Sequence, residues 1–478
     1  MTEEKPDILA LDLDGTLLGT DSLWELFFKA LSLGRLAPLA WLVSGRLAFK
    51  KRLAETVELD FDRLPWNQRV IDLAMAHREA GGEVWLATAA NEAMAVKVCA
   101  RFDFFSGYLA SDDKINLKSR AKARELSGRF GRGKYAYAGD SRADVAVWAE
   151  ADRAIVVNSG RLSRLARPLS GKVEVIAPVG TKSPSLGQIL SAARAYQWVK
   201  NIILFVPIFL AHAFSAANFG RVFLAFIVFC LFSSAGYIIN DLLDIDSDRR
   251  HPSKHNRPFA SGAIDLSRGG LIFLGALVGG LVIASLVGQL FILLAGIYLV
   301  SAVLYSLRFK SVAILDVIVL TLLYTLRILA GGQAVGLEVS QWLLSFSFFT
   351  FASLSLFKRL TELKRLTQAA ASENTRRPYV AADAGFIRSI AAGSICCAVL
   401  TLAIYVGDAA ARKYYGFPGL LLAFCPILFY WLARLLKLAD EGKIDYDPII
   451  FVLSDRQSWI CLGLGIVIYF CASLGVSV

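Results

Sequence analysis

The chain has 478 residues, of which 56% are hydrophobic and only 19% are charged, and its net charge is +11. Soluble domains carry roughly 25% charged residues, so the composition excludes a chain that is soluble throughout, and the aromatic content of 12% excludes a disordered one. Seven cysteines, an odd count with all but Cys99 in apolar runs, exclude a disulfide scaffold, and the lack of a CxxC pair disfavours zinc or redox use. No basic stripe with stacking aromatics indicates nucleic-acid binding.

The first 178 residues mix charged side chains with short apolar strands. The stretch Ile8–Leu11 predicts a buried strand, which leads directly into Asp12, Leu13, Asp14 and Gly15. Two carboxylates two positions apart, at a strand end before a glycine turn, point the same way. A nucleophile and a proton donor need that arrangement.

Further polar residues follow later strands. A strand over 83–87 ends at Thr88, Lys118 comes next, and a strand over 135–138 leads into Gly139 and Asp140. Because the carboxyl ends of parallel strands meet at one edge of a sheet, we expect these side chains near Asp12.

This order of motifs resembles the haloacid dehalogenase superfamily over most of residues 7–178. The resemblance implies an α/β Rossmann-like phosphatase domain over 1–178, with a helical cap inserted between Asp14 and Thr88. It implies that Asp12 attacks phosphorus, that Asp14 serves as acid and base, and that Thr88 and Lys118 hold the phosphate. A degenerate domain that serves only as a scaffold is the alternative.

The same resemblance implies a magnesium site. Asp12 and Asp140 would hold Mg²⁺, together with the main-chain carbonyl of Asp14, and oxygen ligands suit this cation. Asp144 is a further candidate ligand, although a carboxylate that only stabilises a helix start is nearly as well supported.

The remainder of the chain predicts a membrane domain. Lys182–Ser185 has the composition of a linker, so we assign 179–197 to a linker and an interfacial helix. Residues 198–478 predict an all-α domain with about nine membrane-spanning segments. These lie near 199–215, 219–239, 268–288, 291–307, 313–333, 341–357, 387–407, 416–436 and 457–476. Basic residues gather in alternate loops, which predicts a multi-pass inner-membrane protein with these loops and the N-terminal domain in the cytoplasm.

A cluster of carboxylates ends the second apolar segment. Asp241, Asp244 and Asp248 are spaced to share one face of a helix, and Asn240 lies at its edge. Three carboxylates this close repel one another unless a cation neutralises them. A divalent cation would do so and could bridge a pyrophosphate. A solvated acidic and basic loop is the plainer alternative, because Arg257 and other basic residues follow.

This cluster with Arg257-Pro258 resembles the UbiA-type prenyltransferase superfamily over residues 189–478. Later stretches resemble its polyprenyl-phosphate (decaprenyl-phosphate) phosphoribosyltransferase branch. That resemblance implies that Asp241, Asp244 and Asp248 hold a Mg²⁺-pyrophosphate donor, with Asp241 and Asp244 in the catalytic role. The implied substrate-binding residues are Asn240, Arg257, Lys200, Lys310, Arg327, Lys358 and Arg359.

One departure from typical prenyltransferases indicates the acceptor. Their second aspartate-rich motif, after the sixth helix, is replaced here by a segment with Lys358 and Arg359 and one carboxylate, Glu362. A basic segment suits a metal-free monophosphate. Arg327 lies within a span, where a charge is expensive, so a phosphate or carboxylate partner is favoured over interhelical pairing. For Lys310, a topology anchor and a phosphate ligand are equally supported.

Together these features predict a bifunctional enzyme. It would transfer 5-phosphoribose from phosphoribosyl pyrophosphate to a polyprenyl phosphate, and its phosphatase domain would then remove the 5-phosphate. The main alternative is a prenyltransferase that moves a polyprenyl group from its diphosphate to an aromatic or other acceptor. A transporter or membrane scaffold with a regulatory phosphatase is the third reading, and the carboxylate cluster disfavours it.

Overall fold

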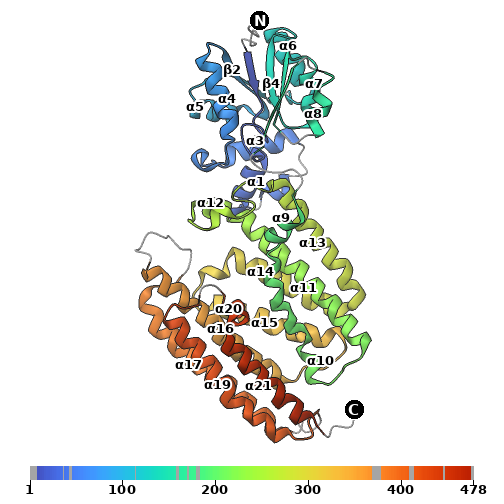
Figure 1. Cartoon of the computed structure of the whole chain (residues 1–478), viewed down its shortest axis with the longest axis vertical. Helices are drawn as coiled ribbons and strands as arrows, with labels where there is room; N and C mark the ends of the chain where they lie inside the picture. Colours follow the sequence, from blue (N-terminus) through green and yellow to red (C-terminus); the bar gives the residue numbers. More distant parts are fainter. Residues whose placement is uncertain are drawn as a thin grey trace. The chain divides into compact units, whose positions relative to one another are not determined.

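The chain forms two compact units in the computed structural model (Figure 1). The structure describes residues 8–35, 37–41, 46–112, 115–157, 161–169, 172–178, 184–368, 378–408, 414–444 and 447–474. Unit 1 comprises Met1–Ala193 and Ile238–Phe273, and unit 2 comprises Arg194–Tyr237 and Leu274–Val478. The segment Ile238–Phe273, which carries the aspartate cluster, therefore packs with the N-terminal part rather than with the other helices. Within the expected linker Lys182–Ser185, Lys182 and Ser183 lie outside the described residues.

Unit 1 is built on a six-stranded parallel sheet of order β3-β2-β1-β4-β5-β6. This confirms the expected α/β Rossmann-like fold, in which strand order reverses beside β1. The strands are β1 (Ile8–Leu11), β2 (Glu83–Asn91), β3 (Phe105–Ser111), β4 (Tyr135–Gly139), β5 (Arg153–Val157) and β6 (Lys172–Ile176). Because β1 pairs with both β2 and β4, its carboxyl end, where Asp12 begins, lies at the centre of the site edge.

Helices cover both faces of this sheet, which explains why its central strands are apolar on both sides. On one face pack α4 (Gln68–Glu79) and α5 (Glu92–Arg101). On the other pack α6 (Arg120–Phe130), α7 (Val145–Trp148) and α8 (Arg161–Ala166). A 3₁₀ turn, η2 (Arg142–Asp144), precedes α7, and α9 (Leu186–Ala192) ends this part of the chain.

The expected helical cap lies between β1 and β2. It contains α1 (Ser22–Ser32), α2 (Ala37–Trp41) and α3 (Arg46–Thr56), followed by the 3₁₀ turn η1 (Phe61–Arg63). Asp21 caps α1, since its carboxylate accepts a hydrogen bond from the Leu23 amide. Phe27 and Phe28 are buried in the core that also holds the apolar side chains of β1.

We call Ile238–Phe273 the aspartate hairpin. It contains the end of α11 (Ala216–Leu243), then α12 (Ile245–Arg250) and η4 (Lys254–Asn256), and the start of α13 (Leu266–Val287). Its apolar side chains Leu242, Ile245 and Phe259 belong to the same buried cluster as the cap and the sheet. The hairpin is therefore part of the core of unit 1.

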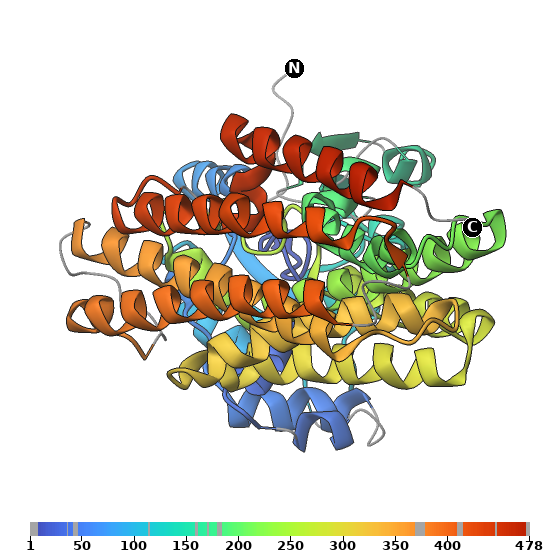
Figure 2. The same cartoon turned by 90° about the horizontal axis from the view of Figure 1, so that it is seen from below.

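Unit 2 consists of helices that lie side by side, as Figure 2 shows. It begins with η3 (Ala195–Phe205) and α10 (Val206–Leu210) and includes the first parts of α11 and the remainder of α13. Next come α14 (Gln289–Leu307), η5 (Phe309–Ser311), α15 (Leu315–Ala334) and α16 (Gln341–Gln368). The last elements are η6 (Ala381–Asp383), α17 (Ala384–Gly407), η7 (Pro418–Ala423), α19 (Phe424–Asp440), α20 (Pro448–Ser454) and α21 (Arg456–Ser473).

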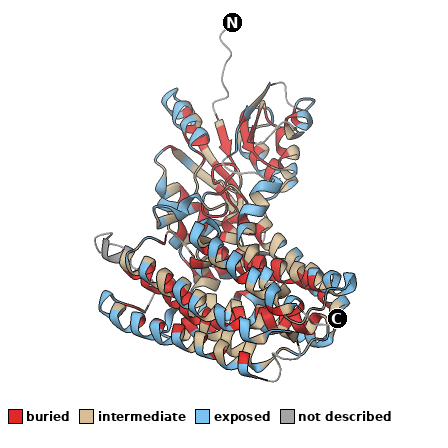
Figure 3. Ribbon diagram, turned by 60° about the horizontal axis from the view of Figure 1, so that its bottom comes forward, coloured by how far each residue is buried: buried red, intermediate tan, exposed pale blue. Residues whose placement is uncertain are grey.

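Among the described residues, eight helices are long and apolar enough to cross a membrane, where the sequence predicts about nine. The difference lies at the first expected segment, 199–215. There the chain forms a 3₁₀ helix and a short α-helix around Pro207, which together make the shorter apolar helix Ala195–Leu210. The other eight segments match helices. Many of their exposed side chains are apolar, for example Leu271, Leu286 and Phe470, as a lipid-facing surface requires. Figure 3 shows exposed stretches along the helices.

Close packing against η3 requires a glycine in α15. A Cβ atom at Gly331 would lie 2.0 Å from the main-chain oxygen of Leu204. Small residues permit such approaches between membrane helices. By contrast, a Cβ atom at Gly296 of α14 would meet open space, so close packing does not require that glycine.

We predict that Gly331→Val destabilises the protein by about 1–3 kcal/mol or more, because the added side chain must displace the main chain of η3. The measurement is the midpoint of thermal unfolding in detergent, followed by loss of the monodisperse elution peak. Gly296→Val is the matched control and should leave the midpoint nearly unchanged. Equal effects of the two substitutions would contradict the packing argument.

Candidate active sites

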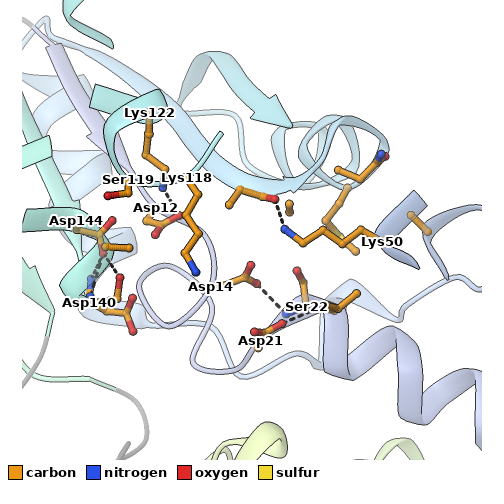
Figure 4. Close-up of a pocket in the computed structure, with 18 of the residues that line it drawn as sticks. Asp12, Asp14, Asp21, Ser22, Lys50, Lys118, Ser119, Lys122, Asp140 and Asp144 are labelled. Carbon is orange, nitrogen blue, oxygen red and sulfur yellow. Dashed lines mark hydrogen bonds and ion pairs between the residues drawn. The ribbon is translucent and has the colours of Figure 1, made fainter. Parts of the chain in front are cut away.

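A cavity of about 240 Å³ lies at the carboxyl edge of the sheet, beneath the cap. Asp12 and Asp14 reach it from the end of β1, and Asp140 reaches it from the end of β4. Lys50 of α3 also lines it and donates a hydrogen bond to the Ala89 carbonyl at 2.5 Å. Figure 4 shows these side chains pointing into one space.

The residue in contact with Asp12 is a lysine that sequence reasoning missed. The Lys122 ammonium lies 2.9 Å from Asp12 Oδ1 and donates to the Tyr137 hydroxyl at 2.8 Å. Lys118, the residue predicted from the sequence, lines the same cavity (Figure 4). In the sequence, Lys122 follows Lys118 by one helical turn. It lies on the buried face of α6 together with Ala123 and Leu126, and this pattern was the signal for it.

Three carboxylates converge next to this pair. One oxygen each from Asp12, Asp140 and Asp144 lies within 4.8 Å of the other two. The turn that follows Asp14 requires a glycine, because Gly15 has φ of +75° and a Cβ atom there would lie 2.1 Å from Asp140 Oδ2. Such a set of oxygen donors fits Mg²⁺.

Asp144 also has a structural task. Its carboxylate accepts hydrogen bonds from the Ser141 amide at 2.9 Å, the Ser141 hydroxyl at 2.6 Å and the Tyr137 hydroxyl at 2.8 Å. These bonds hold the loop that presents Asp140. Both readings of Asp144 offered by the sequence therefore find support in the geometry.

The carboxyl groups of Asp12 and Asp14 have raised pKa values. Burial raises the pKa of Asp14 to about 6, and the neighbouring charge of Asp21 adds to the shift. Burial also raises the pKa of Asp12 to about 6, against the opposing effect of Lys122. The Asp14 carboxylate accepts a hydrogen bond from the Ser22 amide at 2.7 Å. A carboxyl group whose pKa lies near 6 can both give and take a proton close to neutral pH, which suits an acid and base.

Thr88 is fully buried, and its hydroxyl accepts a hydrogen bond from the Ala90 amide at 2.9 Å. The wall of the cavity on this side is formed by Ala89, Ala90 and Asn91. The last residues of β2 therefore line the cavity, and the buried Thr88 hydroxyl holds the Ala90 amide.

The aspartate hairpin holds a second acidic group. Arg257 Nη1 donates to Asp241 Oδ1 at 3.1 Å and to Asp248 Oδ2 at 2.6 Å, so these oxygens surround one cationic position. The Asp248 amide donates to the Asp244 carbonyl at 2.8 Å, and the Asp244 amide donates to the Asn240 carbonyl at the same distance. Helical spacing thus continues across the join of α11 and α12. A site that already accommodates a guanidinium nitrogen between two carboxylates fits a divalent cation.

Unit 2 contains a basic pair arranged around an aspartate that sequence reasoning missed. Lys200 of η3 lies 2.6 Å and Lys358 of α16 lies 3.3 Å from the same oxygen, Asp447 Oδ2. Both lysines hold the pKa of Asp447 below its usual value, although burial opposes them. Asp447 also caps α20 by accepting from the Ile449 amide. The signal in the sequence was Asp447-Pro448, a typical helix start.

Two of the predicted substrate-binding arginines, Arg327 and Arg359, are bonded to groups of their own and of neighbouring helices. Arg327 donates to Asn201 at 2.8 Å, to the Leu323 carbonyl at 2.7 Å and to the Tyr298 hydroxyl at 2.7 Å. Its guanidinium also lies over the ring of Tyr324. The sequence favours a phosphate or carboxylate partner for Arg327, whereas the structure pairs its guanidinium with neutral groups of η3, of α14 and of its own helix. These bonds offset the cost of a charge where solvent is excluded.

Arg359 is likewise part of the helix packing. Its side chain is 1% exposed and pairs with Asp316 at 2.6 Å. It also bonds Glu362 and the Tyr305 hydroxyl, the latter at 2.8 Å. The predicted phosphate contact therefore lies in a buried ion pair that joins α15 and α16. Lys310, by contrast, is half-buried in η5, the turn between α14 and α15.

Comparisons with known proteins agree with this architecture. The model of the UbiA prenyltransferase family matches residues 202–446. An uncharacterized protein y4nM of Sinorhizobium fredii is 36% identical over 467 residues, which cover 94% of this chain and 88% of that protein. The nodulation protein NoeC of Azorhizobium caulinodans is 32% identical over 60% of this chain and 94% of its own length. The decaprenyl-phosphate phosphoribosyltransferase of Mycobacterium tuberculosis is 29% identical over 56% of this chain and 88% of its own length.

The chain belongs to the UbiA prenyltransferase family. It is an integral membrane protein in which the family's helical domain follows an N-terminal part built on a six-stranded parallel α/β sheet. The resemblance to the UbiA superfamily expected from the sequence is thereby confirmed.

We predict that Lys122→Gln lowers the rate of phosphomonoester hydrolysis at least a hundredfold, because the Asp12 carboxylate loses the ammonium group that lies 2.9 Å away and the incoming phosphate loses a cation. The measurement is kcat with p-nitrophenyl phosphate. Lys118→Gln, measured in parallel, shows how far the second lysine of the cavity contributes. Lys97→Gln, which removes an exposed lysine paired with Glu58, is the control. Unchanged activity in Lys122→Gln would refute the assignment.

Proposed function

We propose that the protein is a bifunctional enzyme of polyprenyl-phosphate sugar metabolism. Its transferase domain moves 5-phosphoribose from phosphoribosyl pyrophosphate to a polyprenyl phosphate, and its phosphatase domain removes the 5-phosphate from the lipid product. The similarity to decaprenyl-phosphate phosphoribosyltransferases supports the first activity. The observation that carries the combination is that the aspartate hairpin and the phosphatase cavity belong to one compact unit.

For the transfer step, Asp241, Asp244 and Asp248 would hold the Mg²⁺-bound pyrophosphate of the donor, with Asn240 and Arg257 beside it. Arg257 already spans two of these carboxylates and can exchange them for pyrophosphate oxygens. The acceptor phosphate requires cations, and Lys200 and Lys358 supply two, with Lys310 as a further candidate. A phosphate oxygen of the lipid attacks C1 of the ribose, and pyrophosphate leaves.

For the hydrolytic step, the Asp12 carboxylate attacks phosphorus and Asp14 gives its proton to the departing ribose oxygen. Asp14 then takes a proton from the water that hydrolyses the phosphoaspartate. Lys122 and Lys118 hold the phosphate oxygens. Asp12, Asp140 and the main-chain carbonyl of Asp14 would hold Mg²⁺, with Asp144 as a further ligand or as support. When bound, Mg²⁺ would neutralise charge on the pyrophosphate at one site and on the phosphate at the other.

The membrane assignment completes the proposal. A phosphorylated, cytoplasmic donor and the basic loops support a location of both sites on the cytoplasmic side of the inner membrane. The second candidate, transfer of a prenyl group from its diphosphate, is favoured only by family membership. A prenyl diphosphate would bring its own pyrophosphate to the aspartate hairpin and would give a product without ribose.

We predict that full-length protein in detergent, given Mg²⁺, phosphoribosyl pyrophosphate and a polyprenyl phosphate, forms polyprenyl-phosphoryl ribose. Asp12→Asn should accumulate the 5-phosphorylated lipid instead, and Asp241→Asn should form neither product, because each variant lacks one essential carboxylate. The measurement is lipid mass spectrometry. Asp72→Asn, an exposed aspartate of α4, is the control. Absence of pentose on lipid in every sample, with turnover of a prenyl diphosphate, would establish the second candidate.

Removal of divalent cations should stop both reactions, since the carboxylates of each site repel an incoming anionic substrate unless a cation is present. The measurement adds EDTA to the same assay and follows both lipid products. Restored turnover on addition of excess Mg²⁺ is the expected control result. Phosphatase activity that persists in EDTA would contradict the assignment of Asp12 and Asp140 as ligands.

A further inference from the structure

We propose that the phosphatase cap positions the aspartate motif of the transferase through an ion pair between Glu25 and Arg249, which we call the clamp. Arg249 is thus a positioning residue for Asp244 and Asp248. This inference rests on the proposed role of those aspartates in donor binding. All residues concerned lie in unit 1, where α12 lies beside α1 (Figure 1).

The clamp is a two-pronged ion pair inside the unit. Arg249 Nη1 donates to Glu25 Oε2 at 3.1 Å, and Nη2 donates to Oε1 at 2.6 Å. The two side chains are 5% and 1% exposed. The third donor, Nε, bonds the Ala260 carbonyl at 3.2 Å. Arg249 therefore ties α12 to the cap helix and to the far limb of the hairpin at once, with the planar geometry that only an arginine offers.

Other contacts extend this interface. Lys29 of α1 forms an ion pair with Asp246 of α12, and Asp60 accepts from Arg250 at 3.3 Å. Beneath them, Ile245 is 2% exposed and belongs to the buried cluster that contains Phe27 of the cap. The hairpin and the cap thus share one hydrophobic core.

Helix geometry makes this contact relevant to the carboxylates. Residues four apart share a face, so Ile245 and Arg249 form one row directed at the cap, and Asp244 and Asp248 form the neighbouring row. Helix α12 has only six residues and the backbone leaves helical geometry at Asp244, so contacts with the cap help to set the rotation of α12. Fixing the cap-facing row therefore fixes the direction of Asp244 and Asp248, and with them the position between Asp241 and Asp248 that Arg257 now fills.

The test uses full-length protein and compares Glu25→Gln, Arg249→Gln and the double substitution. Each single variant leaves one buried charge without its partner and frees α12. We expect the KM for phosphoribosyl pyrophosphate to rise about tenfold or more. The effects should not add in the double variant, because both substitutions remove the same contact. Arg249→Lys should recover only part of the loss, since lysine keeps the charge but not the two-pronged geometry.

The matched control is Arg250→Gln, which removes the neighbouring arginine of the same helix from its exposed pair with Asp60. Its KM should stay within about twofold of the wild type, because an exposed ion pair contributes little. Unfolding midpoints of all variants separate misfolding from misplacement. Additive losses, or a KM that is unchanged in well-folded Arg249→Gln, would overturn the clamp.

A second measurement separates the clamp from the proposed function. Electron paramagnetic resonance follows Mn²⁺ binding to the full-length protein in an Asp140→Asn background, which removes a proposed ligand of the phosphatase site. We expect Arg249→Gln to weaken the Mn²⁺ site that Asp241→Asn removes. If that site weakens but the wild type never transfers phosphoribose, the clamp holds and the proposed donor is wrong. Unchanged Mn²⁺ binding in a protein that does transfer phosphoribose would refute the clamp alone.

Discussion

Buried carboxylates matched by lysine or arginine side chains organise both halves of this molecule. Taking a charge out of water is costly unless a partner or a metal offsets it, so each buried aspartate or glutamate fixes where a lysine or arginine must be. The pairs are Asp12 with Lys122, Glu25 with Arg249, Asp241 and Asp248 with Arg257, Asp316 with Arg359, and Asp447 with Lys200 and Lys358. Most of these pairs draw together segments that lie far apart in the sequence.

The pairs divide by what surrounds them. Glu25 with Arg249 and Asp316 with Arg359 are nearly inaccessible to solvent and join helices, so they serve architecture. The Lys122 pair lies at the edge of a cavity, and Arg257 is 26% exposed, so an anionic substrate or a metal can displace one partner. The same chemistry thus holds helices in place at one position and prepares a binding site at another.

Fusion of the two folds has a structural consequence that a flexible linker would not produce. The aspartate hairpin connects two apolar helices, yet its side chains complete the core of unit 1. Loss of the cap would therefore expose Ile245 and Phe259 and remove the carboxylate partner of Arg249. The 36% identity to y4nM over nearly the whole chain shows that this two-part organisation occurs in another protein.

Local patterns in the sequence determined much of this protein. Strand ends with Asp12 and Asp140 predicted the parallel sheet and its site edge, and apolar runs predicted eight of the spanning helices, because burial and membrane thickness constrain short stretches of chain directly. Helical spacing placed Asp241 and Asp248 on one face for the same reason.

Only the tertiary structure decided which cation meets which anion. Lys122 rather than Lys118 contacts Asp12, Arg327 meets neutral groups, Arg359 meets Asp316, and Asp447 joins two distant lysines. Nor did the sequence show that the aspartate hairpin belongs to the N-terminal unit. An ion pair depends on the direction and burial of side chains from separate elements, and no local periodicity records which of several similar charges packing will bring together.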